Sequence, residues 1–238
     1  GADKYMSIFA VGDLHLAFDS RIEKPMDIFG DRWKDHPQRL KEFWYENVKN
    51  DDIVIIAGDV SWGLRVDEAM ADFQWLHTLA GTKIITKGNH DLWWTSVNKM
   101  NGLFDDIIFL QNHCYVVEDM DIAIAGSRGW ICPGSDGFDS HDEKIFKREL
   151  IRLKFSLEEA KSSGAKEIIA VLHYPPTNDK HQVSEFTKML TDYGVKICVY
   201  GHLHGKDSFS RGFQGILDGV EYRLISLDYL ECKLKHLR

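Results

Sequence analysis

Five short apolar runs, each followed closely by Gly, Asp, Asn or His, constrain the fold of this chain more than any other sequence feature. Short runs rich in isoleucine and valine are typical of β-strands that are buried on both faces of a sheet. The runs and the clusters after them are Ser7–Val11 with Gly12-Asp13-Leu14-His15, Ile53–Ala57 with Gly58-Asp59, Lys83–Thr86 with Gly88-Asn89-His90-Asp91, Ile168–Leu172 with His173-Tyr174-Pro175, and Ile197–Tyr200 with Gly201-His202-Leu203-His204.

Amphipathic helical patterns alternate with these runs, because apolar residues recur in them at spacings of three and four. The predicted helices are Arg39–Val48, Val66–Leu79, Lys144–Ser162 and Val183–Leu190. A strand followed by a helix, repeated along the chain, implies parallel strands joined by crossovers. Ligand crevices in such sheets lie at the carboxyl ends of the strands, so we expect the five polar clusters to converge there.

A second sheet is predicted from the middle and the end of the chain. Ile107–Leu110 and Tyr115–Val117 alternate in polarity, Ile122–Gly126 is apolar, and Val220–Leu230 has the character of a further strand. We therefore expect an α/β fold in which two mixed β-sheets pack face to face with helices outside.

The chain is predicted to form a single domain over residues 1–238. It has no internal repeat, low-complexity tract or Pro-rich linker. Residues 1–5 precede a plausible start at Met6, and the predictions of fold and function do not depend on them. The charged loop 17–37 follows the first polar cluster and is long enough to cap a site there.

Charge and hydropathy restrict the class of partner. The formal net charge of −8 argues against a non-specific grip on nucleic acid, which needs a basic face. The chain lacks an apolar run of about 18 residues that could span a membrane and lacks the apolar stretch of a signal peptide. The four cysteines are far apart and show no zinc-binding spacing. We expect free thiols and a cytoplasmic location.

Eight polar side chains lie at the five strand ends, and seven of them are good ligands for divalent metal ions. Carboxylate, amide and neutral imidazole groups together suit Mn, Fe, Zn or Co. In extended backbone, the i, i+2 spacing of Asp13 with His15 and of His202 with His204 would aim both members of each pair the same way. A lone Asp or His after a strand is more often a turn or core residue. Five such clusters in converging loops favour a metal site instead. The set is Asp13, His15, Asp59, Asn89, His90, His173, His202 and His204.

These blocks resemble the calcineurin-like metallophosphoesterases, whose series is D-x-H, G-D, G-N-H-D/E, H and G-H-x-H. All five occur here in order between Asp13 and His204. The resemblance implies a four-layer α/β/β/α sandwich and two divalent ions, with Mn, Fe and Zn all suited to the ligands. One ion would be held by Asp13, His15, Asp59 and His204, and the other by Asp59, Asn89, His173 and His202.

The family's chemistry implies a phosphoesterase in which a hydroxide shared by the two ions attacks phosphorus. The catalytic residues would be His90, Asp59 and Asn89. His90 would not be a ligand but would contact a phosphate oxygen or protonate the leaving alkoxide. Asp91 would either orient His90 or cap the following segment.

Two branches of the family fit poorly. The Ser/Thr protein phosphatases have G-D-x-V-D-R-G in the second block, whereas this chain has Gly58-Asp59-Val60-Ser61-Trp62-Gly63. The lipid A precursor pyrophosphatases usually have Arg at the position of His90. What remains is a broad group of small bacterial-type phosphatases and phosphodiesterases. We expect a small phosphomonoester or phosphodiester as substrate, with a nucleotide among the alternatives.

Substrate contacts are predicted from residues beside the blocks. Trp62, Trp93 and Trp130 could stack on a base or wall the pocket, although each could equally fill the gap between loop and core. Arg128 could bind a substrate phosphate or form a surface ion pair. Within the loop 17–37, the candidates are Arg21, Lys24, Arg32 and His36.

Two other functions stay open at this point. Some family members have lost catalysis and serve as protein-binding scaffolds, but these lack ligand residues or the counterpart of His90, and this chain keeps all eight side chains. A nuclease is the alternative enzyme, which the acidic composition disfavours.

Overall fold

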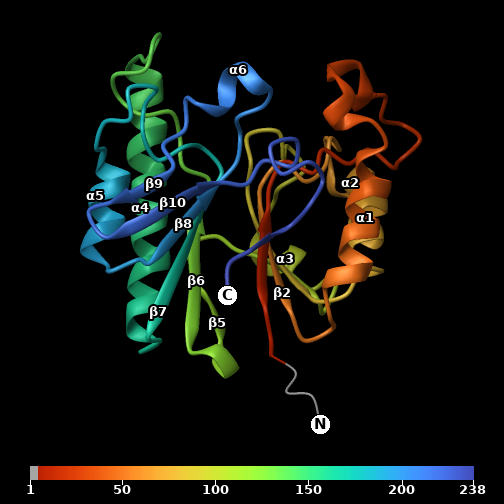
Figure 1. The fold of residues 1–238 in the computed structure, drawn as a ribbon, viewed down its shortest axis with the longest axis horizontal. Helices are drawn as coiled ribbons and strands as arrows, with labels where there is room; N and C mark the ends of the chain where they lie inside the picture. Colours follow the sequence, from red (N-terminus) through yellow and green to blue (C-terminus); the bar gives the residue numbers. More distant parts are fainter. Residues whose placement is uncertain (1–4) are drawn as a thin grey trace.

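The computed structural model describes residues 5–238 and contains two β-sheets between two layers of helices (Figure 1). The first sheet has the order β11-β1-β2-β3-β4. Its strands are β1 (Ile8–Val11), β2 (Ile53–Ala57), β3 (Thr82–Thr86), β4 (Ile107–Phe109) and β11 (Lys235–His236). Strands β1 to β4 pair in parallel, and β11 is antiparallel to β1.

The second sheet has the order β5-β6-β7-β8-β10-β9. Its strands are β5 (Tyr115–Val117), β6 (Ile122–Ser127), β7 (Glu167–Leu172), β8 (Ile197–Tyr200), β9 (Gly215–Leu217) and β10 (Val220–Leu224). The four central strands are parallel, whereas β5 and β9 are antiparallel edges. Both sheets are therefore mixed, as the sequence predicted. The assignment of Ile107–Leu110 to the second sheet was wrong, because β4 pairs with β3 in the first.

Helices cover the outer face of each sheet. In Figure 1, α1 and α2 lie on one side and α4 and α5 on the other. The helices are α1 (His36–Asn47), α2 (Val66–His77), α3 (Val97–Met100), α4 (Ser140–Ser162), α5 (Glu185–Asp192) and α6 (Lys206–Phe209), with short 3₁₀ helices η1 (Met26–Phe29), η2 (Asp31–Trp33) and η3 (Glu118–Met120). This arrangement confirms the predicted α/β/β/α sandwich.

Alternating side chains of the strands enter two different cores. Ile8 of β1 and Ile55 of β2 belong to the core between the two sheets, which also holds Ile124 and Val171 of the second sheet. Their neighbours on the same strands, such as Phe9, face the helices instead. A strand buried on both faces has to be apolar throughout, and this explains the continuous apolar runs.

The C-terminal strand prediction was too long. Strand β10 ends at Leu224, and the chain then turns, with Glu231 and Cys232 at positive φ. Ser226 forms an isolated bridge with Gly12 at the end of β1. The apolar residues beyond Leu224 are buried because this segment lies against the first sheet, although it does not continue the strand.

Helix boundaries differ from the predictions by a few residues, for reasons visible at the caps. Helix α4 begins at Ser140, because Asp139 and Asp142 form a capping box ahead of the apolar pattern. Helix α1 begins at His36, where Pro37 suits the first turn. The predicted loop 17–37 therefore contains η1, η2 and the start of α1.

All four cysteines are free, as predicted. Within residues 5–238, none of the helices combines the length and the apolar character needed to cross a bilayer.

Candidate metal centre

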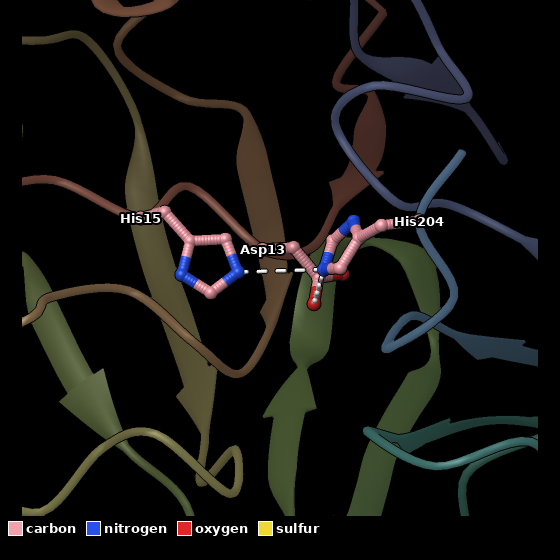
Figure 2. Close-up of side chains that lie close together, drawn as sticks. All are labelled: Asp13, His15 and His204. Atoms are coloured by element: carbon pink, nitrogen blue, oxygen red, sulfur yellow. Dashed lines mark hydrogen bonds and ion pairs between the residues drawn. The ribbon is translucent and has the colours of Figure 1, made fainter. Parts of the chain in front are cut away.

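The loops after β1, β2, β3, β7 and β8 bring the predicted ligand residues to one end of the two sheets. Figure 2 shows Asp13 and His15 from the loop after β1 beside His204 from the loop after β8. Asp13 and His15 thus follow a strand of the first sheet, and His204 follows a strand of the second. The site is therefore built where the carboxyl ends of both sheets meet.

The first group of ligand atoms surrounds one point. His204 Nε2 lies 3.3 Å from Asp13 Oδ1 and 3.4 Å from His15 Nε2. His15 Nε2 lies 3.7 Å from Asp59 Oδ2. Ligand atoms bound to one divalent ion at about 2.0–2.2 Å are roughly 3–3.5 Å apart. These distances therefore fit a single ion among Asp13, His15, Asp59 and His204.

The second group shares Asp59 with the first. His173 Nε2 lies 3.2 Å from Asp59 Oδ2 and 2.8 Å from Asn89 Oδ1. His202 Nδ1 lies 3.2 Å from the same Asn89 oxygen. Asp13 also approaches this group, with Oδ1 4.0 Å from His173 Nε2. Asp59 Oδ2 and Asp13 Oδ1 both lie between the two groups, and Asp59 Oδ2, within 3.7 Å of His15 Nε2 and 3.2 Å of His173 Nε2, is in the position of a bridging ligand.

The donor set fits a cation better than it fits a metal-free network of hydrogen bonds. Asp59 is 1 % exposed, and its Oδ2 atom has no hydrogen-bond partner among the described residues. A buried carboxylate oxygen without a partner is costly. The facing Nε2 atoms of His15 and His204 can share at most one proton between them. A positive ion would satisfy the oxygen and both nitrogens.

The electrostatics of the site keep two imidazoles in the form that binds metal. Burial lowers the pKa of His202 to about 3 and lowers the pKa of His15 well below its ordinary value. Burial opposes ionisation of Asp59, but His173 outweighs it and lowers the pKa of this carboxyl. Burial opposes protonation of His173 and His204 as well, but the neighbouring carboxylates outweigh it and raise their pKa values to about 9 and about 10. Divalent ions bind neutral imidazole and ionised carboxylate, so metal binding here would release protons from these two rings.

Four of the predicted ligands have a left-handed backbone. Asp13, His15, Asp59 and His202 have φ values of 61°, 45°, 52° and 73°. The extended backbone assumed for the i, i+2 pairs was therefore wrong, although the side chains do converge. Residues other than glycine rarely adopt this conformation, and it concentrates at functional sites where the surrounding structure enforces it.

Glycines make room for two of the carboxylates. A Cβ atom on Gly88 would lie 2.2 Å from Asp59 Oδ1, and one on Gly201 would lie 2.2 Å from Asp13 Oδ2. Neither glycine could be replaced by alanine without displacing the neighbouring carboxylate. These two glycines therefore allow the close approach of the strand-end loops.

Hydrogen bonds from the remaining ring nitrogens orient two of the histidines. His173 Nδ1 lies 2.7 Å from the Ala57 carbonyl oxygen, so it donates there and leaves Nε2 free as a ligand. His204 Nδ1 lies 3.0 Å from Asp228 Oδ1. Such partners fix the tautomer of metal-binding histidines.

Asp228 is a functional residue that the sequence analysis missed. It is buried, and its second oxygen accepts a hydrogen bond from the Gly205 amide. It lies 24 positions after His204, in a segment predicted as strand. The segment also contains Glu221 and Arg223, so no distinct signal in the sequence marked Asp228.

Asp91 holds the backbone of the site in place. Its carboxylate accepts hydrogen bonds from the amides of Asp59 at 2.7 Å, Gly88 at 2.7 Å and Val60 at 2.9 Å. Burial, together with the nearby Asp59 charge, raises its pKa. These bonds join the loops after β2 and β3. These contacts differ from the two predicted roles of Asp91, which were to orient His90 or to cap the following segment.

His90 is exposed and lies beside an aromatic side chain. Its ring centroid lies 4.7 Å from that of Trp62, which also stacks on His15 at 4.6 Å with an interplanar angle of 23°. The amide of His90 donates to Asp59 Oδ1 at 2.8 Å. Trp62 therefore contacts a candidate ligand and the candidate acid together.

A pocket of about 710 Å³ opens at His15, His90 and His204. The segment Met26–Trp33 and the side chain of Trp62 form most of the remaining wall. The loop 17–37 thus borders the site, where it was predicted to act as a cap.

The four basic or histidine candidates of this loop have different positions. Arg32 lines the pocket, and Lys24 Nζ lies 5.1 Å from the Trp62 ring centroid. Arg21 pairs with Asp19 and Asp67 on the surface. The ring of His36 is buried between the carbonyl groups of Leu14 and Trp33. Arg32 and Lys24 are thus the two candidates near the pocket.

The other predicted substrate contacts divide between core and site. Trp93 is fully buried among core aromatics, and its indole donates to the Ser61 carbonyl, so it faces the core and not the pocket. Arg128 Nη2 lies 3.1 Å from the buried Glu149 carboxylate. Trp130 packs on Tyr174, whose ring centroid lies 4.2 Å from that of His202. Trp130 therefore supports the second ligand group indirectly.

Solved structures share this fold at low sequence identity. The hydrolase described as phosphopantetheinyl hydrolase from Mycobacterium tuberculosis is similar with a TM-score of 0.58 and 16 % identity, over 97 % of this chain and 95 % of that one. The protein TT1561 of Thermus thermophilus is similar with a TM-score of 0.59 and 10 % identity, over 98 % of each chain. A protein of unknown function, AQ665 from Aquifex aeolicus, has a TM-score of 0.52 and 12 % identity, over 98 % of this chain and 96 % of that one. At these identities the likeness establishes the fold alone.

A search of curated proteins returned no match. The family model described as calcineurin-like phosphoesterase matches residues 6–206, a range that contains all five sequence blocks. The converging Asp and His side chains lie within that range, and the sandwich agrees with it. This chain belongs to the calcineurin-like phosphoesterase family.

Proposed function

We propose that this protein hydrolyses small phosphomonoesters or phosphodiesters with the help of two divalent metal ions. The observation that carries the proposal is the shared position of Asp59 Oδ2, which lies 3.7 Å from His15 Nε2 and 3.2 Å from His173 Nε2. A carboxylate between two sets of ligands is the feature of a two-metal site.

The ligand residues would divide between the ions as the family resemblance implies. Asp13, His15, Asp59 and His204 would hold the first, and Asp59, Asn89, His173 and His202 the second. When bound, two such ions supply positive charge to the phosphoryl oxygens and make a water molecule more acidic. Mn, Fe and Zn all suit these ligands.

The residues of the chain itself would perform the remaining steps. His90 is exposed at the pocket and its amide is held by Asp59, so its imidazole can give a proton to the leaving alcohol oxygen. Trp62 packs against His90 and restricts the positions of its ring. Trp33 is 4 % exposed and packs on His15, which keeps water from that side of the ligand.

The test is hydrolysis of p-nitrophenyl phosphate and bis-p-nitrophenyl phosphate by metal-free protein reconstituted with Mn²⁺, Ni²⁺, Fe²⁺ or Zn²⁺. We expect turnover that depends on the metal and is lost in Asp59→Asn. The relative rates of the two esters separate a monoesterase from a diesterase. Bound metal without hydrolysis of either ester would instead favour the scaffold function that some family members have.

A further inference from the structure

The pocket beside His90 is far larger than a phosphoryl group requires. Its volume of about 710 Å³ is in the range of pockets that enclose whole drug-sized ligands, about 300–1,000 Å³. It reaches His15, His90 and His204, the side of the site that holds the first ligand group and the candidate acid. Any part of a substrate that occupies this pocket would therefore lie next to His90.

The pocket wall beside the histidines is predominantly apolar. Met26, Phe29 and Trp33 come from the segment Met26–Trp33, here called the cap segment, and Trp62 follows β2. The charged residues of the wall include Asp31, Arg32 and Lys206, and Arg32 Nη1 already donates to the Asp228 carbonyl at 2.8 Å. The wall thus offers apolar area more than charge to a ligand.

Phe29 shows which kind of ligand this wall suits. Its side chain lines the pocket, yet 67 % of the residue is exposed to solvent. Covering an aromatic ring with an apolar ligand is favourable in proportion to the area removed from water. Its neighbour Ile28 is similarly exposed, at 73 %, but does not line the pocket.

His90 sets the direction in which the ester would lie. If His90 protonates the leaving oxygen, the alcohol portion of the substrate extends from that oxygen into the pocket that His90 lines. The apolar wall would then contact the alcohol portion, whereas the phosphoryl group faces the ligand residues.

From these features we infer that the preferred substrate is a phosphate ester of a bulky apolar alcohol, bound through Phe29 and the cap segment. The inference rests on the proposed phosphoesterase function. The apolar portion is either an alkyl chain or an aromatic ring, and the two are separated by the probes below.

The first test measures binding without turnover, by calorimetry on protein reconstituted with Mn²⁺. The probes are methylphosphonate, hexylphosphonate and 1-naphthylmethylphosphonate, whose carbon–phosphorus bond an esterase does not cleave. Each buried methylene contributes a factor of about four in affinity, so we expect the hexyl or naphthyl probe to bind at least about tenfold more tightly than the methyl probe. Tighter binding of the hexyl probe would indicate an alkyl alcohol, and tighter binding of the naphthyl probe an aromatic one. Equal affinity for all three probes would overturn the inference.

Two matched variants locate the effect. Phe29→Ser should reduce the affinity ratio between the large and the methyl probe by about threefold or more, because it removes the ring from the wall. Ile28→Ser removes a similar apolar area one position away and should leave the ratio unchanged. Equal ratios in Phe29→Ser and the unaltered protein would show that the apolar wall does not select the ligand.

Hydrolysis of phenyl phosphate and 1-naphthyl phosphate separates failure of this inference from failure of the proposed function. These esters have leaving groups of similar acidity and differ in apolar area. A higher kcat/KM for the naphthyl ester, arising mainly in KM, supports the inference. Turnover of both at equal kcat/KM overturns the inference and leaves the phosphoesterase function intact. Tight binding of the large phosphonates with no hydrolysis of any ester would refute the function while the pocket specificity stands.

Discussion

His204 Nδ1 lies 3.0 Å from the buried carboxylate of Asp228, and Nε2 of the same ring lies 3.3 Å from Asp13. The ring therefore connects a residue outside the five sequence blocks to one inside them. Because Asp228 also accepts from the Gly205 amide, it fixes both the ring and the loop that holds it.

Replacing Asp228 should weaken the first metal site selectively. Without the carboxylate, the His204 ring loses its orientation, and such partners are worth about 10–100-fold in metal affinity. We expect this loss in Asp228→Ala and partial rescue in Asp228→Asn, measured by competition with a metal chelator. Asp207→Ala, at an exposed position of α6, is the control. If Asp228→Ala bound metal as tightly as this control, the positioning role would be wrong.

Asp59→Asn should disturb both ions, because Asp59 Oδ2 approaches ligand atoms of both groups. His15→Ala, by contrast, removes a ligand of the first group alone. Metal content per chain, measured after dialysis against a fixed concentration of Mn²⁺, should fall further in Asp59→Asn than in His15→Ala. A loss confined to one ion in Asp59→Asn would contradict the bridging position.

His90→Ala should keep its metals and lose turnover. The ring of His90 is exposed and contacts Trp62, while the ligand atoms of the two groups come from other residues. General acid catalysis typically contributes about 10²–10⁴-fold, so kcat should fall by about 10²-fold or more. His113→Ala, an exposed histidine that pairs with Glu159 of α4, controls for loss of an imidazole. Depleted metal in His90→Ala would reveal that His90 is a ligand.

Asp72 should make stability depend on pH. It is fully buried, and burial raises its pKa from 3.8 to about 6, although Ser61 and the Phe18 amide donate hydrogen bonds to it. The folded state therefore binds the proton more tightly than the unfolded state. This favours folding below about pH 4, and the advantage is lost as pH rises from about 4 to about 6.

Asp72→Asn removes this titration while keeping an oxygen acceptor for the Phe18 amide. Its free energy of unfolding, relative to the unaltered protein, should therefore rise between about pH 4 and about pH 6 and then level off. The rise should be on the order of 2–3 kcal/mol for a shift of about two pH units. Urea unfolding in the presence of chelator at several pH values measures it. Asp119→Asn controls for the lost charge at an exposed position. A difference that stays constant across this range would rule out the raised pKa.

The sequence determined the layers of the fold and the composition of the site. Continuous apolar runs such as Ile53–Ala57 are required of strands with a core on each face, so burial on both sides was visible in the residues themselves. Within each sheet the polar strand ends had to meet, because parallel strands place their carboxyl ends at one edge. Asp13 and Asp59 are together for this reason, whereas His173 joins them because the two sheets pack with these edges side by side.

Only the tertiary structure decided how the site is oriented and what surrounds it. The positive φ values of Asp13 and His15 depend on contacts with the neighbouring loop, and the alternation rule for extended backbone could not foresee them. Asp228 reaches His204 because the end of the chain packs against β1, which is a contact between distant segments. Trp93 and Trp62 were equivalent in sequence, but packing buried one in the core and placed the other at the pocket. Local patterns specify strands and their ends, whereas the neighbours of a side chain are set by how separate elements pack.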